Sequence, residues 1–252
     1  MPQEKDYWKL VTRVINESEL VLIVLDARFP NQTRNPELER KIIKMKKDFI
    51  YIINKADLVD KTELEKKTRH IEPKVLVSSK KNLGTTILRN KIFHLIKKRP
   101  ITISVVGYPN TGKSSLINCL KQKRSAGVSS RSGFTRGKQL LKITEGIYLI
   151  DTPGVIPSST RSETLKALTN IKNPETIKDP DLVAMKIINQ FMKNNPQKLE
   201  DFYQIRVQDT LETTLEAISK RLNHLKKGGK LDTDRTAKKI ITDWQRGKLL
   251  LN

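Results

Sequence analysis

Residues 107–114, which read GYPNTGKS, have the residue types and spacing of a phosphate-binding loop, G-x-x-x-x-G-K-[ST]. An apolar segment, ITISVVG (101–107), precedes the loop, and a helical pattern begins near Lys113. In such a loop, backbone N–H groups and the helix N-terminus surround phosphates with partial positive charge. We predict that Lys113 reaches the β- and γ-phosphates of a nucleotide and that Ser114 holds Mg²⁺. The predicted nucleotide contacts in this loop are Asn110, Thr111, Gly112, Lys113, Ser114 and Ser115.

The sequence DTPG (151–154) ends a predicted strand about forty residues after the phosphate loop, where a second acidic element of a P-loop enzyme belongs. Asp151 is predicted to act on Mg²⁺, through a water molecule, and Gly154 to offer its N–H to the γ-phosphate. Between the two elements, residues 121–142 carry seven basic side chains and no acidic one. A hydroxyl that closes on Mg²⁺ is expected there, and we assign it to Thr135, with Ser129, Ser130 and Ser132 as the alternatives.

A third element contains the residue types that could recognise a purine base. Residues 54–57, NKAD, follow the buried strand pattern DFIYIIN (48–54). The Asp57 carboxylate can accept hydrogen bonds from N1–H and the exocyclic amine of guanine, a donor pair that adenine lacks. Asn54 is expected to bond the other edge of the purine and brace the loop, while the stem of Lys55 covers the base. Support for the base is expected from the SSK sequence that ends the next strand pattern, which comprises Ser78, Ser79 and Lys80.

The order of these elements is unusual, because NKAD comes about fifty residues before the phosphate loop. A standard GTPase runs from the phosphate loop through the switch threonine and D-x-x-G to N-K-x-D and S-A-K. This chain has the same cycle, cut between D-x-x-G and N-K-x-D. A compact domain with neighbouring termini tolerates such a cut, because the contacts within its sheet survive. The sequence therefore predicts a circularly permuted GTPase domain, in which the conventional motif order becomes G4-G5-G1-G2-G3.

The surrounding patterns supply the elements that must position these residues. Strand patterns at 19–28, 48–54, 74–79 and 101–107 alternate with helical patterns, which indicates a parallel sheet covered on both faces. A turn at Glu145-Gly146 joins two further strand patterns into a hairpin at an antiparallel edge. After Gly154 only helical patterns follow. We predict an α/β P-loop GTPase domain over residues 1–157 and an all-helical, RNA-binding domain over residues 158–252.

The chain has 252 residues and a formal net charge of +22, distributed as +10 over residues 1–100, +6 over 101–154 and +6 over 155–252. A positive field of this size favours polyanions such as nucleic acid, and the alternative is a lysine-rich composition with solvated charged faces. No segment approaches the roughly 20 apolar residues of a membrane span. A single cysteine, Cys119, excludes an intramolecular disulfide. We expect a cytoplasmic protein that is monomeric when free and has no membrane partner.

The motif order, together with LDARFPNQTRN (25–35) before the guanine element, resembles the circularly permuted GTPases of the YlqF/YawG group. The ending GGKLDTDRTAKKIITDWQRGKL (228–249) is similar to the C-terminal helical segment of that family. Ser79 departs mildly from the family, which has alanine at this position. The resemblance implies binding and hydrolysis of GTP, with GDP and Mg²⁺ bound. It also implies a role in large ribosomal subunit assembly, with ribosomal RNA or pre-ribosomal particles as partners.

The residue after DTPG is Val155, where many GTPases carry a glutamine that orients the attacking water. Valine can neither orient water nor transfer a proton, so slow intrinsic hydrolysis is expected, stimulated by the ribosomal particle. The resemblance also suggests that Asn110 helps bind K⁺ near the phosphates, and the alternative is a side chain that stabilises the turn. The catalytic assignments are thus Lys113, Thr135, Gly154 and Asn110. An RNA-binding module with nucleotide as a structural ligand is the alternative function.

Overall fold

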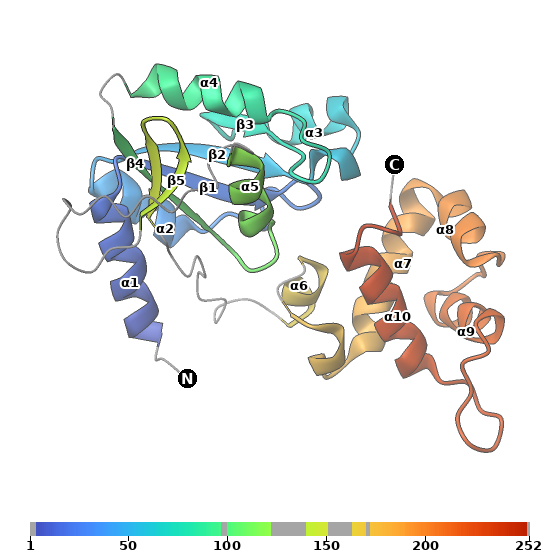
Figure 1. Cartoon of the computed structure of the whole chain (residues 1–252). Coiled ribbons are helices and arrows are strands. Elements are labelled where there is room, and N and C mark those ends of the chain that lie inside the picture. The colour runs from blue at the N-terminus through green and yellow to red at the C-terminus, as the bar shows by residue number, and fades with distance from the viewer. Residues whose placement is uncertain (1–3, 97–99, 122–139, 151–162, 170–171, 251–252) are drawn as a thin grey trace. The chain divides into compact units, whose positions relative to one another are not determined.

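The computed structural model describes the chain except residues 1–3, 97–99, 122–139, 151–162, 170–171 and 251–252 (Figure 1). Backbone contacts divide the chain into two compact units, Met1–Ser158 and Ser159–Asn252. They are called unit 1 and unit 2 below. Within the described residues, no helix combines the length and the apolar character needed to cross a membrane.

Unit 1 is built on one six-stranded sheet with the order β3-β2-β1-β4-β6-β5. All neighbouring strands are parallel except β5, which pairs antiparallel with β6 and forms an edge. The β5–β6 hairpin turns at Glu145-Gly146, as the sequence predicted, and Gly146 has the positive φ of 73° that such a tight turn uses. The strands are β1 (Leu20–Asp26), β2 (Asp48–Asn54), β3 (Lys74–Leu76), β4 (Ile101–Gly107), β5 (Leu140–Thr144) and β6 (Ile147–Ile150).

The central strand β1 is buried along its whole length because helices cover both faces of the sheet. On one face, Leu20, Leu22 and Val24 pack with residues of α4 (Thr85–Leu95) and α5 (Lys113–Leu120). Figure 1 shows α1 (Glu4–Glu17) and α2 (Pro36–Lys44) on the side away from α4. A strand buried on both faces reads as a continuous apolar run, which explains the pattern seen in the sequence.

Local signals in the sequence set the starts of two helices of unit 1. Asn35 caps α2, accepting hydrogen bonds from the backbone N–H groups of Glu37 and Leu38, and Pro36 occupies the first turn. Asp60 caps α3 (Lys61–Lys67) in the same way through Glu63 N–H. A short 3₁₀ helix, η1 (Ala56–Leu58), lies between β2 and α3.

The predicted strand over 74–79 is wrong in its C-terminal half, because β3 ends at Leu76. Beyond it, Ser78 exchanges two backbone hydrogen bonds with Leu83, at 3.0 and 3.1 Å, in an isolated antiparallel bridge. The chain therefore folds back into a tight loop at the SSK sequence instead of continuing the sheet.

The sheet brings the predicted site to one edge. The parallel register sets Asp26 beside Asn54 at the ends of β1 and β2, and Val24 beside Gly107 where β4 ends. The chain moves from β1 to one side, towards β2 and β3, and then returns to the other side at β4. Ligands of open α/β sheets bind outside the carboxyl ends of strands at such a switch point.

The described part of unit 2 is mainly helical, as predicted for residues after Gly154, and packs around Trp244 and Phe191. Their rings meet edge to face with centroids 6.1 Å apart, and both side chains are buried. The Trp244 indole N–H donates to the carbonyl of Leu168 at 3.1 Å. The helices are α6 (Glu163–Leu168), η2 (Pro174–Thr176), α7 (Pro180–Asn194), α8 (Pro196–Tyr203), α9 (Leu211–Arg221) and α10 (Thr233–Gln245).

Candidate functional site

The phosphate-binding loop leaves β4 at Gly107 and enters α5 at Lys113. Its backbone passes through left-handed conformations at Asn110 (φ 60°) and Gly112 (φ 95°). A Cβ atom at Gly112 would lie 2.2 Å from Nδ2 of Asn54, so only glycine fits both the backbone angle and the space. Thr111 is buried, and its hydroxyl donates to the Tyr108 carbonyl at 3.0 Å.

The predicted phosphate ligands lie at the N-terminus of α5. Lys113 is half-buried, and its Nζ donates to the carbonyl of Tyr108 at 2.6 Å, across the loop. Burial lowers the pKa of Lys113 to about 8. Ser114 and Ser115 are exposed in the first turn of α5. This end of the helix offers N–H groups, a cation and two accessible hydroxyls, which together suit a nucleoside phosphate and its Mg²⁺.

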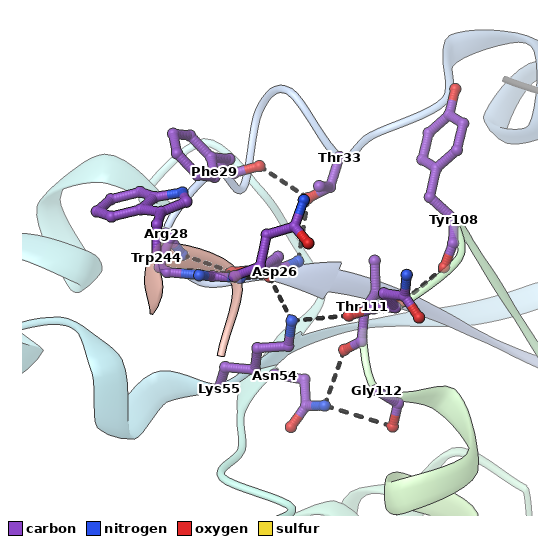
Figure 2. Close-up of polar contacts among 12 residues, drawn as sticks. Asp26, Arg28, Phe29, Thr33, Asn54, Lys55, Tyr108, Thr111, Gly112 and Trp244 are labelled. Carbon is purple, nitrogen blue, oxygen red and sulfur yellow. Dashed lines mark hydrogen bonds and ion pairs between the residues drawn. The ribbon is translucent and has the colours of Figure 1, made fainter. Parts of the chain in front are cut away.

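Asn54 joins three predicted parts of the site. Its Nδ2 donates to the carbonyls of Thr111 at 2.9 Å and Gly112 at 3.4 Å (Figure 2). Its Oδ1 accepts from the N–H and the hydroxyl of Ser79 at 3.1 and 2.8 Å. The side chain is 1% exposed, so these bonds are shielded from water. One amide thus fixes the phosphate loop against the SSK loop, and its predicted bond to the purine stays a prediction.

Asp57 lies beside the SSK loop. Its Oδ1 accepts a hydrogen bond from the Ser78 hydroxyl at 2.6 Å, and the Ser78 oxygen in turn accepts from the Lys81 N–H at 3.1 Å. Ser78 therefore orients the carboxylate that is predicted to read guanine. Lys80, the last residue of the SSK sequence, is exposed.

Lys55 connects the guanine element to the phosphate loop from a second direction. Its Nζ donates to Oδ2 of Asp26 and to the carbonyl of Asn110, both at 2.7 Å (Figure 2). Its backbone is left-handed, with φ of 63°, which turns the chain out of β2. Burial lowers the pKa of Lys55, and the neighbouring Asp26 opposes that shift. The stem of Lys55 is therefore held at both its backbone and its ammonium group.

Asp26 is a site residue to which the sequence reasoning assigned no role. Its carboxylate is fully buried and also accepts bonds from the Arg28 guanidinium, with Nε–Oδ1 at 3.0 Å and a second nitrogen to Oδ2 at 2.7 Å. Burial alone would raise the pKa of Asp26, but hydrogen bonds and charge from Arg28 and Lys55 outweigh it and lower the pKa to about 2. The available signal was an acidic residue ending an apolar strand at the same sheet edge as NKAD.

A second connection that the sequence did not reveal runs from α2 to the phosphate loop. The Asn35 side chain, which caps α2, donates from Nδ2 to the hydroxyl of Tyr108 at 3.1 Å, and both residues are buried. Thr33 closes the intervening loop by accepting from the Asp26 N–H at 3.0 Å and donating to the Phe29 carbonyl at 2.7 Å. No pattern in the sequence pairs positions 73 residues apart.

Three predicted residues, Thr135, Asp151 and Gly154, lie outside the described residues, as do the alternatives Ser129, Ser130 and Ser132 and the neighbouring Val155. Asn110, proposed to help bind K⁺, is exposed at the tip of the phosphate loop, where its carbonyl accepts from Lys55. No cluster of three or more His, Cys, Asp or Glu that could hold a metal ion is present in the part of the chain that the structure describes.

Two family models match this chain. The one described as RsgA GTPase matches residues 3–159, and the one described as 50S ribosome-binding GTPase matches residues 102–220. The matches together cover the guanine element, the phosphate loop and part of unit 2.

Among curated proteins, the chain is 41% identical over 245 residues to the uncharacterized GTP-binding protein MJ1464 of Methanocaldococcus jannaschii. It is 30% identical over 261 residues to nucleolar GTP-binding protein 2 of Cryptococcus neoformans. In each case 96% of this chain is aligned, but the chain spans only 65% of the first relative and 37% of the second.

Among solved structures, GDP-bound YlqF from T. maritima superimposes with a TM-score of 0.69 at 23% identity, covering 99% of this chain and 96% of that one. The GNP-bound form of the same protein gives a TM-score of 0.67. The convergence of NKAD, SSK and the phosphate loop at one sheet edge agrees with these matches. The chain belongs to the RsgA GTPase family and has the circularly permuted P-loop fold of the YlqF/YawG group.

Proposed function

We propose that this protein is a GTP-binding and GTP-hydrolysing switch that acts in large ribosomal subunit assembly by binding ribosomal RNA or pre-ribosomal particles. The observation that carries the nucleotide part of the proposal is the Asn54 amide. It bonds the phosphate loop through Thr111 and the base-supporting loop through Ser79, although Thr111 lies 57 positions away in the chain. Two loops that must hold opposite ends of one nucleotide are thereby fixed at a constant separation.

The base recognised is guanine. The Asp57 carboxylate is oriented by Ser78 at 2.6 Å and carries a negative charge that suits two N–H donors on one purine edge. Adenine offers no such donor pair, so the Asp57 carboxylate would gain no hydrogen bond from the base, which costs binding energy. Lys55 covers the base with a stem that is anchored by Asp26 at 2.7 Å.

The phosphates bind across the N-terminus of α5. Lys113 exchanges its bond with the Tyr108 carbonyl for one with a phosphate oxygen, and the helix N-terminus adds partial positive charge. Ser114 would hold Mg²⁺ together with Thr135 and, through a water molecule, Asp151, and the ion would offset negative charge on the β- and γ-phosphates. Gly154 donates its N–H to the γ-phosphate. Hydrolysis is slow in the free protein, because Val155 cannot orient the attacking water.

The ribosomal part of the proposal rests on charge and on relatives. A net charge of +22 spread over both units favours a large polyanion. One matching family model carries the description 50S ribosome-binding GTPase, and several relatives are named as nucleolar GTP-binding proteins. A protein that hydrolyses GTP slowly when free and faster when bound to the particle would act as a switch that signals correct assembly.

The test is GTP hydrolysis by the full chain in K⁺ or Na⁺ salt, with and without purified large ribosomal subunits. We expect subunits to stimulate hydrolysis, and a requirement for K⁺ would assign Asn110 its role. Ser114→Ala, which removes one proposed Mg²⁺ ligand, is the control for contaminating activity. GTP binding without stimulated hydrolysis, combined with retained binding to the particle, would favour an RNA-binding module with nucleotide as a structural ligand.

A further inference from the structure

The connection between α9 and α10 in unit 2 is a short β-hairpin, residues 224–232, which we call the α9–α10 hairpin. The N–H of Asp232 donates to the His224 carbonyl at 2.8 Å, and the N–H of Lys226 donates to the Lys230 carbonyl at 2.7 Å. Gly228 and Gly229 form its tip with φ of 88° and 79°. Two consecutive left-handed residues suit a tight hairpin turn, which favours glycine at both positions. Figure 1 shows this segment projecting beyond the ends of α9 and α10.

Buried hydroxyl groups attach the base of the hairpin to both helices. The Ser219 hydroxyl on α9 donates to Oγ1 of Thr236 on α10 at 2.8 Å, and Nδ1 of His224 lies 2.9 Å from the same oxygen. The Thr236 hydroxyl also donates to the Asp232 carbonyl at 3.0 Å, so this one oxygen joins α9, α10 and the base of the hairpin. Ser219 and Thr236 are both fully buried. The tip is therefore presented from an anchored base, which reduces the entropy lost when it binds a partner.

The hairpin presents three ammonium groups over five residues. Lys226, Lys227 and Lys230 are all exposed, and none of them forms an ion pair with any residue that the structure describes. Lys220 and Arg221, in the last turn of α9, are exposed immediately before it. Residues 220–231 contain no acidic side chain.

The structure separates these lysines from the other basic residues near the end of the chain. Lys239 on α10 pairs with Asp243, whose side chain is buried, and Lys238 pairs with Asp234 at 2.7 Å. Those two lysines compensate charges within unit 2. The hairpin lysines form no ion pair of this kind with any described residue.

Two acidic residues near the base of the hairpin form hydrogen bonds within unit 2, although Oδ1 of Asp181 is buried without a hydrogen-bond partner among the described residues. Asp232 accepts from the Arg235 N–H at 3.1 Å as the cap of α10, and Asp181 on α7 accepts from the Thr233 hydroxyl at 3.4 Å. Burial raises the pKa of Asp181, and the charge of Lys226 opposes that shift.

Building on the function proposed above, we propose that the α9–α10 hairpin contacts the phosphate backbone of ribosomal RNA through Lys226, Lys227 and Lys230. Ammonium groups on flexible stems bind phosphate as point charges and need no particular base. The segment carries no aromatic side chain that could stack on a base other than His224, whose ring is tied to Thr236. The hairpin therefore increases the affinity for RNA and helps to position the protein on it, but it does not recognise the base sequence.

The test compares two triple variants of the full chain that lose the same charge. The first is Lys226→Ala, Lys227→Ala and Lys230→Ala. The matched control is Lys186→Ala, Lys193→Ala and Lys198→Ala on α7 and α8 of the same unit. Binding to protein-free large-subunit RNA from Methanocaldococcus jannaschii is measured at GDP saturation between about 50 and about 200 mM KCl. Circular dichroism checks that both variants are folded.

Each released phosphate contact lowers the slope of log K against log salt by about 0.7 to 0.9, so the hairpin variant should lose about 2 to 3 in slope. The control should keep the wild-type slope to within about one contact. Equal slopes for both triple variants would overturn the inference, while wild-type binding to the subunit would leave the proposed function standing. Weaker binding to intact subunits but not to protein-free RNA would identify a ribosomal protein as the partner instead. A wild-type chain that binds neither would refute the proposed function itself.

Discussion

The buried carboxylate of Asp26 lies between two cations, Arg28 and Lys55, so the substitution Asp26→Asn should destabilise unit 1. The amide keeps the shape of the side chain but replaces one carboxylate oxygen with an N–H donor. Oδ2 now accepts from Arg28 and Lys55, each at 2.7 Å, so both cations would lose an acceptor. The Arg28 side chain is 4% exposed, so water cannot replace the lost acceptor unless the side chain changes its conformation.

The magnitude follows from burial and from the pKa. Removing one partner from a buried ion pair costs about 3 to 5 kcal/mol at neutral pH. The pKa of Asp26 falls from its ordinary 3.8 to about 2, which is worth about 2 kcal/mol of folding stability. Because the folded-state pKa is depressed, this stability is fully present above the ordinary pKa and is lost as pH falls towards the folded value. The stability difference between wild type and Asp26→Asn should therefore narrow by about 2 kcal/mol between about pH 5 and about pH 2.

The assay is denaturant unfolding of unit 1 at a series of pH values. The chain has two tryptophans, Trp8 on α1 and Trp244 in unit 2, so a Trp244→Phe background leaves Trp8 fluorescence as the reporter. The background is common to every variant and drops out of each difference. The other carboxylates are the same in both proteins of each comparison, so their titration also cancels in the difference.

Glu72→Gln is the matched control for a carboxylate-to-amide change. The Lys74 hydrogen bond lowers the pKa of Glu72, but its side chain is 59% exposed, so screening by water should leave little pH-dependent difference. If the wild-type and Asp26→Asn stabilities differ by a constant amount from pH 5 to pH 2, the account of Asp26 as a buried counter-charge is refuted.

Three further predictions concern the nucleotide site. Asp57→Asn should weaken GDP binding at least about a hundredfold and improve binding of xanthosine diphosphate, because an amide can donate to the second carbonyl of xanthine; competition titrations would show it. Gly112→Ala should destabilise unit 1 and weaken nucleotide binding, because the new Cβ would lie 2.2 Å from Asn54 Nδ2. Gly228 has a similar φ but open space around it, so Gly228→Ala should lower the free energy of unfolding, measured by thermal unfolding, by only about 1 to 2 kcal/mol. Burial lowers the pKa of Lys113 to about 8 and phosphate favours its charged form, so GDP affinity should fall by up to roughly tenfold for each pH unit above 8, and Lys113→Arg should lose this dependence when titrated alongside.

Sequence patterns alone predicted the main elements of this protein. Continuous apolar runs marked strands buried on both faces, Asn35-Pro36 marked the start of α2, and Glu145-Gly146 marked the hairpin turn. These signals are local, since each depends on a few neighbouring residues and on the backbone angles that they favour. The order of the motifs likewise predicted the circular permutation, because motif order is a property of the chain and not of its folding.

Which side chains meet depends on the tertiary structure. The bonds from Asn54 to Thr111 and from Asn35 to Tyr108 depend on the register of β1 with β2 and β4, which brings distant strand ends to one edge. The partners of Asp26 depend on the same register. Lys239 and Lys230 look alike in the sequence, but one compensates the buried Asp243 and the other is exposed on a hairpin. Charge pairing of this kind depends on burial and on distances in the folded protein, and neither can be derived from the spacing of residues along the chain.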